Sequence, residues 1–233
     1  MTRTFIAIAR DPRIVPGIHH YCDEWCTTCA QTRRCLAFRC MEAYRKSKGR
    51  SALEPPFQST EETVAFTRAL AAVEGIGTPE LDALLENPAR TAPFRTKDPL
   101  AHTALEYALG LSMWLVMSPE ELAQRRRGGS PGPEEVLLWF HLRIYLKLSR
   151  ALVTRERVLK GLTARNEDAI GCAKLTLVAV QRSRKALQQL RTEATAATAD
   201  PLLGCLDTIE RGVDERFPTA RAFVRVGLDV PAG

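Results

Sequence analysis

The chain has 233 residues, of which 45% are hydrophobic and 26% are charged. This composition excludes a largely disordered, fibrous or membrane-embedded protein, and the length allows a substantial hydrophobic core. The formal net charge of +6 is spread along the chain, and no aromatic side chains interleave with the basic runs, so nucleic-acid binding is not indicated.

The N-terminal segment carries no recognisable export signal. Its apolar stretch, FIAIA, ends at Arg10 and is shorter than the apolar core of a signal peptide. The best candidate for a membrane span, ALGLSMWLVM, ends at Ser118 and falls short of the roughly 20 residues that cross a bilayer. We therefore expect a cytoplasmic protein with no membrane partner.

The most informative segment is a run of cysteines with the spacing C-x3-C-x2-C-x5-C-x4-C. It contains five of the seven cysteines: Cys22, Cys26, Cys29, Cys35 and Cys40. In a reducing compartment such clustering favours a metal over disulfide bonds. Because short spacings let successive thiolates converge, we predict that one metal centre is bound by Cys22, Cys26, Cys29 and Cys35.

Four thiolates suit both a [4Fe–4S] cluster and Zn²⁺. Structural zinc commonly uses two cysteine pairs separated by about a dozen residues or more, whereas several thiolates in one compact run are more typical of a cluster. The spacing therefore favours a [4Fe–4S] cluster slightly over zinc. His19 or His20 could replace one cysteine, and Cys40 could replace Cys35.

The cysteine segment resembles motifs of two protein groups. The C-x3-C-x2-C part resembles the cluster motif of radical S-adenosylmethionine enzymes, but that family needs a β/α barrel, and no alternation of strands and helices follows here. Residues 12–38 more closely resemble a signature of uncharacterised bacterial proteins, through Pro16-Gly17, YCDEWCTTC and Arg34-Cys35. That resemblance implies a metal site and no established activity.

Start signals for helices recur after residue 50. Ser59-Thr60-Glu61-Glu62 has the pattern of a capping box, in which the Ser59 hydroxyl and the Glu62 carboxylate each bind a backbone N–H, and it predicts a helix to about Val73. Thr78-Pro79 predicts a short helix to Glu86. Asp98-Pro99 predicts a longer one, whose apolar stripe comprises Leu100, Ala104, Tyr107, Leu111 and Trp114.

Further helices follow toward the C-terminus. Ser118-Pro119 predicts a short helix that the loop at residues 128–133 ends, and an unbroken apolar pattern from Glu134 predicts a long one. Asn166 is expected to cap its antiparallel partner, which should be buried on several sides around residues 169–180. Asp200-Pro201 predicts a last helix, followed by a tail whose alternating apolar residues could be extended.

These elements predict an all-α protein, with a helical bundle of four to five main helices and an N-terminal cysteine-rich metal-binding segment. We expect residues 1–50 to hold the cysteine segment and a first helix. Residues 51–233 are expected to form the bundle, in one globular unit with that segment.

Other histidines and one lysine are weaker candidates for a site. His102 and Glu106 lie four residues apart on one helix face and are expected to be an exposed pair, while His141 lies in an apolar helix and is expected to be a hydrogen-bonded core residue. Lys174 lies in an apolar run and is expected to extend its ammonium to the surface.

Three functions are compatible with these residues. The favoured one is a metal-stabilised interaction or scaffold domain, which leaves open a protein partner. The alternatives are an iron–sulfur redox or sensor protein and an enzyme with a site in the bundle core; whether the protein is an enzyme is left open.

Overall fold

The computed structural model of the chain describes residues 2–51, 54–75, 97–117, 131–162, 166–193 and 195–229. These residues contain seven α-helices, one short 3₁₀ helix and no strand, which confirms the all-α prediction. None of the helices in these ranges is long and apolar enough to cross a membrane. The contacts divide the chain into two compact units, one of Met1–Ala92 with Val224–Gly233 and one of Pro93–Phe223.

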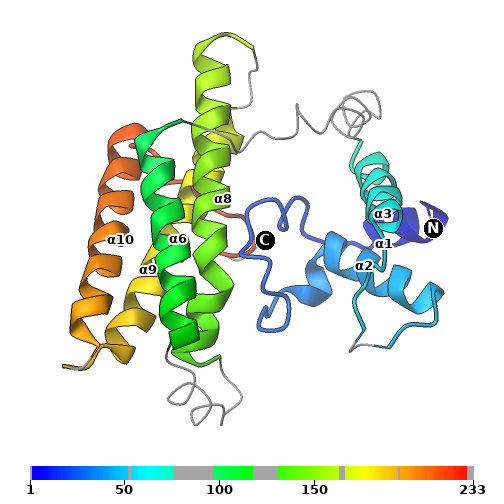
Figure 1. The fold of residues 1–233 in the computed structure, drawn as a ribbon. Helices are drawn as coiled ribbons and strands as arrows, with labels where there is room; N and C mark the ends of the chain where they lie inside the picture. Colours follow the sequence, from blue (N-terminus) through cyan, green and yellow to red (C-terminus); the bar gives the residue numbers. More distant parts are fainter. Residues whose placement is uncertain are drawn as a thin grey trace. The chain divides into compact units, whose positions relative to one another are not determined.

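The first unit contains the helices α1 (Thr2–Ala9), α2 (Leu36–Ser47) and α3 (Thr60–Val73), with a 3₁₀ turn, η1 (Thr32–Arg34), just before α2 (Figure 1). Each of the three α-helices contributes one aromatic side chain to a common core. The ring centroids of Phe5 and Phe66 lie 5.4 Å apart and those of Tyr44 and Phe66 5.8 Å apart. The cysteine segment, residues 11–31, connects α1 to η1.

Helix α3 lies in the range 51–233 that we expected to form the bundle, but its contacts are with α1 and α2. The reason is a side-chain match that no local signal encodes, because Phe66 packs between Phe5 and Tyr44. Its predicted start is confirmed, since the Ser59 hydroxyl accepts the Glu62 N–H at 3.2 Å. The carboxylate of Glu62, however, accepts the N–H of Gln58 at 2.8 Å, so the capping box is offset by one residue.

An ion-pair network ties the start of the cysteine segment to α2. The Asp11 carboxylate binds the guanidinium of Arg13 at 2.7 Å and that of Arg39, on α2, at 2.6 Å. Hydrogen bonds from Arg13 and then Arg39 hold the pKa of Asp11 well below its usual range. A backbone hydrogen bond joins the start of the segment to η1, where the Val15 N–H donates to the Arg34 carbonyl at 3.0 Å.

The second unit is a four-helix bundle of α6 (Pro99–Met117), α8 (Pro133–Leu159), α9 (Asn166–Leu190) and α10 (Ala196–Arg216) (Figure 1). Helix α8 packs on α9 and α6, and α10 packs on α6 and α9, so the four form a closed ring. As predicted, α9 is buried on several sides, and its buried residues include Ala169, Cys172, Ala173, Leu175, Leu177 and Val180.

The helix starts are confirmed where one side chain caps them. Asp98 accepts the Leu100 N–H at 2.9 Å at the start of α6. Helix α9 begins close to its predicted start, but Asn166, expected to be its cap, is its first helical residue. The predicted start of the last helix was wrong, since α10 begins at Ala196, ahead of Pro201. Asp200 does not cap it, because its carboxylate binds Arg191 at 2.6 Å.

The remaining predicted elements lie outside the described residues or differ from expectation. The short helices predicted at Thr78–Glu86 and after Ser118, and the loop residues 128–130, are outside the described ranges. The tail, which could have been extended, has turns at residues 218–222 and 227–229, with only Val226 in a bridge among its described residues. Gly227 adopts a φ of 76°, a left-handed conformation that lets the chain turn back.

Candidate metal centre

The cysteine segment has turns in place of regular secondary structure. Two residues take left-handed conformations, Gly17 with a φ of 67° and Glu24 with a φ of 58°. The Cys29 N–H donates to the Cys26 carbonyl at 3.3 Å, which closes a turn between two of the predicted ligands. The segment is therefore folded into a compact loop, and its side chains could meet without a helix or strand to position them.

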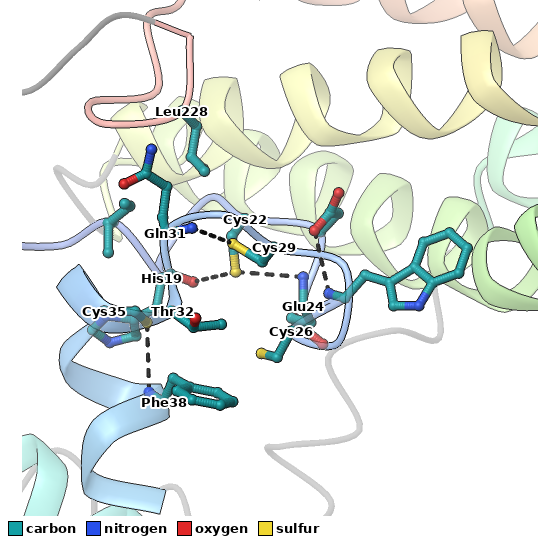
Figure 2. Close-up of a pocket in the computed structure, with 13 residues that line it drawn as sticks. His19, Cys22, Glu24, Cys26, Cys29, Gln31, Thr32, Cys35, Phe38 and Leu228 are labelled. Carbon is teal, nitrogen blue, oxygen red and sulfur yellow. Dashed lines mark hydrogen bonds between the residues drawn. The ribbon is translucent and has the colours of Figure 1, made fainter. Parts of the chain in front are cut away.

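The four predicted ligands line one cavity (Figure 2). Cys22, Cys26, Cys29 and Cys35 contribute to its wall together with residues that include Trp25, Phe38 and Leu228. Each of the four cysteines is partly buried. The structure thus brings the four thiols that the spacing predicts into one cavity. The C-terminal segment also lines this cavity, through Leu228.

Backbone N–H groups point at three of the four sulfurs. The N–H groups of Glu24 and Gln31 each donate at 3.4 Å, to Cys22 and Cys29 respectively, two residues before the donor. Cys35 is the N-cap of α2, and its sulfur accepts the Phe38 N–H at 3.5 Å. Such donors, and the positive end of a helix, stabilise negative charge on sulfur, which is the charge that a thiolate ligand carries.

The sulfurs do not gather at metal-ligand distance in the described part of the chain. In those residues, three side chains of the metal-binding types have ligand atoms that all lie within 4.8 Å of one another. They are His19, His20 and Glu74, and none of them is a cysteine. The four thiols consequently share a cavity without closing on a common point. A metal bound by all four would have to draw them inward.

Burial favours the protonated form of three of the four thiols, those of Cys22, Cys26 and Cys35. It raises the pKa of Cys22 to about 11 and that of Cys26 to about 11, and it also raises the pKa of Cys35. Because metal ligation requires thiolates, an ion would have to displace these protons, and its affinity would rise with pH.

The other cysteines occupy different surroundings. Cys40 is fully buried among Phe5, Leu36 and Tyr44 and does not line the cavity, so it is placed as a core residue. Cys172 is likewise buried, in α9, and Cys205 is partly buried in α10.

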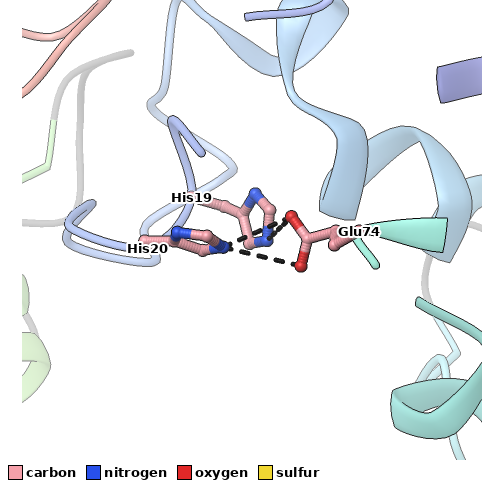
Figure 3. Close-up of side chains that lie close together, drawn as sticks. All are labelled: His19, His20 and Glu74. Atoms are coloured by element: carbon pink, nitrogen blue, oxygen red, sulfur yellow. Dashed lines mark hydrogen bonds and ion pairs between the residues drawn. The ribbon is translucent and has the colours of Figure 1, made fainter. Parts of the chain in front are cut away.

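His19, His20 and Glu74 form a second cluster, which the sequence does not predict (Figure 3). The sequence suggests the two histidines only as replacements for a cysteine, whereas Nε2 of each lies against the Glu74 carboxylate. Burial by itself would raise the pKa of Glu74, but hydrogen bonds and positive charge from His19 and His20 outweigh it and lower the pKa to about 2. No spacing signal could have revealed the contact, since Glu74 is 54 residues from His20.

The weaker candidates have ordinary surroundings. His102 and Glu106 form an exposed pair at 3.2 Å on α6, as expected. His141 makes the expected kind of hydrogen bond, with its Nδ1 2.8 Å from the Leu138 carbonyl, but the prediction that it is a core residue was wrong, since it is partly exposed. Lys174 donates to the Arg221 carbonyl at 2.7 Å and makes no ion pair among those found in the described ranges, so its ammonium is satisfied by backbone.

No protein-family model, curated protein or solved structure matches this chain. Its function has to be inferred from its own residues.

Proposed function

We propose that Cys22, Cys26, Cys29 and Cys35 bind one metal centre, and that the protein is a metal-stabilised interaction or scaffold domain. The observation that carries the proposal is that the four thiols line one cavity. Backbone N–H groups are aimed at three of them, which is the arrangement that favours thiolates.

The compact spacing makes a [4Fe–4S] cluster the first candidate for the centre and Zn²⁺ the second. Either would be held by four thiolates, so the geometry of the cavity does not choose between them. The two differ in electrons, because a cluster can be reduced and zinc cannot.

A structural role is supported by how little else organises the cysteine segment. Val15 and Ile18 are buried and pack near Gly227, where an added Cβ would lie 3.2 Å and 2.9 Å from their side chains. Apart from these contacts and those of Asp11, His19 and His20 described above, the segment is made of turns, with no helix or strand between Asp11 and Gln31. A centre that joins Cys22, Cys26 and Cys29 of the segment to Cys35, the N-cap of α2, would supply cross-links that the turns lack.

The first test is the metal content of the full chain purified without oxygen. For this centre we expect about four iron atoms and matching sulfide per chain, or about one zinc ion, and loss of that amount of metal in the Cys26→Ser, Cys29→Ser double variant. Cys205→Ser is the matched control, since it removes a partly buried thiol of the other unit. A metal-free parent, or a double variant with unchanged metal content, would refute the proposal.

A further inference from the structure

The cluster of His19, His20 and Glu74 brings three potential ligand atoms within 4.8 Å of one another (Figure 3). Nε2 of His19 lies 3.2 Å from Oε1 of Glu74, and Nε2 of His20 lies 3.3 Å from the same oxygen. Zinc bonds of about 2.0–2.2 Å at tetrahedral angles place neighbouring ligand atoms about 3.3–3.5 Å apart. The nitrogen–oxygen distances therefore match the edges of a tetrahedron around such an ion.

Local backbone structure aims both rings at the carboxylate. Gly17 takes a left-handed conformation, and its carbonyl accepts the His20 N–H at 2.9 Å, which closes the turn that carries the two histidines. The rings then lie edge to face with centroids 4.5 Å apart. In this arrangement two consecutive residues, which usually point apart, present the same nitrogen to one partner.

The position of Glu74 makes a cation favourable there. Glu74 is the C-cap of α3, so its carboxylate lies at the negative end of the helix dipole, where a second negative charge is disfavoured. Its side chain is only 14% exposed, and that of His19 only 15%. A carboxylate withdrawn from water at such a position needs a positive partner, which a metal or a protonated histidine can supply.

We propose that Nε2 of His19, Nε2 of His20 and the carboxylate of Glu74 bind one divalent transition-metal ion of the zinc class. Two imidazoles and one carboxylate are a donor set that zinc accepts, with the fourth position left to water. The site is separate from the proposed four-cysteine centre and does not depend on it.

The ion would have a defined structural consequence. It would fasten the cysteine segment, at His19 and His20, to the end of α3. Because the His19 carbonyl accepts the Cys22 thiol at 3.5 Å and His19 also lines the cysteine cavity, the second site would steady the wall of the first.

The test is equilibrium binding of Zn²⁺ to the full chain, followed by elemental analysis, with Glu74→Gln and His20→Ala as variants. We expect each variant to bind one zinc ion fewer than the parent, or to bind it more than about 10-fold more weakly, because loss of even an outer-shell partner costs about 10–100-fold. Glu106→Gln is the matched control. It alters a carboxylate at the same 3.2 Å from a histidine, but in a pair of two ligands, and should bind as the parent does.

Two results would overturn the second site. Equal zinc binding by the parent, Glu74→Gln and His20→Ala would show that the cluster binds no zinc ion. Loss of zinc from Glu106→Gln as well would show that the loss in the other variants is non-specific. Failure of the four-cysteine centre looks different, since the Cys26→Ser, Cys29→Ser variant would keep all of its metal while Glu74→Gln lost one ion.

Discussion

Leu137→Ala should destabilise the four-helix bundle by about 2–5 kcal/mol, whereas Leu138→Ala should change its stability by less than about 1 kcal/mol. The two leucines are neighbours on α8, but Leu137 is fully buried and Leu138 is 51% exposed. Truncating Leu137 removes buried methyl groups and leaves a cavity against α9 and α6, which bracket α8. Truncating Leu138 removes atoms that already face water.

Urea denaturation followed by circular dichroism would measure both effects. Because the chain has two compact units, the bundle transition should be identified by hydrogen exchange of α8 and α9 amides. The pair is its own control, since the residue type, helix and substitution are identical. Similar losses at both positions would mean that the face of α8 assigned to the core is incorrect.

The same helix shows how far periodicity can predict a core. Its run of apolar residues places Leu137, Phe140 and Ile144 in the interior at three-to-four spacing, as a helical pattern requires. Leu138 and Leu142 belong to the same run and remain exposed. Apolar character alone could not separate the two faces, because the choice depends on where α6 and α9 lie.

Local signals predicted helix starts better than they predicted partners. Asp98 and Ser59 cap their helices within two or three residues, so the pattern is contained in the sequence. The placement of α3 depends on the contact between Phe66 and Phe5, which are 61 positions apart in the sequence, and no capping pattern reports such a contact. The predicted start of α10 was wrong because the Asp200 carboxylate binds Arg191 and does not cap the helix.

The candidate sites divide in the same way. Cysteine spacing was sufficient to identify four residues that share a cavity, because Cys22 to Cys35 are close in sequence. It could not indicate how far apart the sulfurs lie, because that depends on the turns the backbone takes between them. Glu74 could not be found at all, since it reaches His19 and His20 only after α3 has packed.

Removing the metal from the four-cysteine centre should speed amide hydrogen exchange across residues 12–40 by at least about 100-fold. A ligand present at 100 times its dissociation constant stabilises the state that binds it by about 2.7 kcal/mol, which corresponds to that factor. The other restraints on the cysteine segment include the ion pairs of Asp11, the buried side chains of Val15 and Ile18, one backbone bond to Arg34, and the contacts of His19 and His20 with Glu74.

The measurement compares the metal-loaded full chain with the same protein after chelation, with α8 and α9 as an internal reference. Their amides should be equally protected in both samples, because their contacts lie within the other unit. A change confined to residues 12–40 would support a structural centre. Unchanged exchange there, together with an absorbance that dithionite bleaches reversibly, would instead identify a redox centre. Zinc gives no such absorbance, and loss of a structural cluster would change the exchange of the segment.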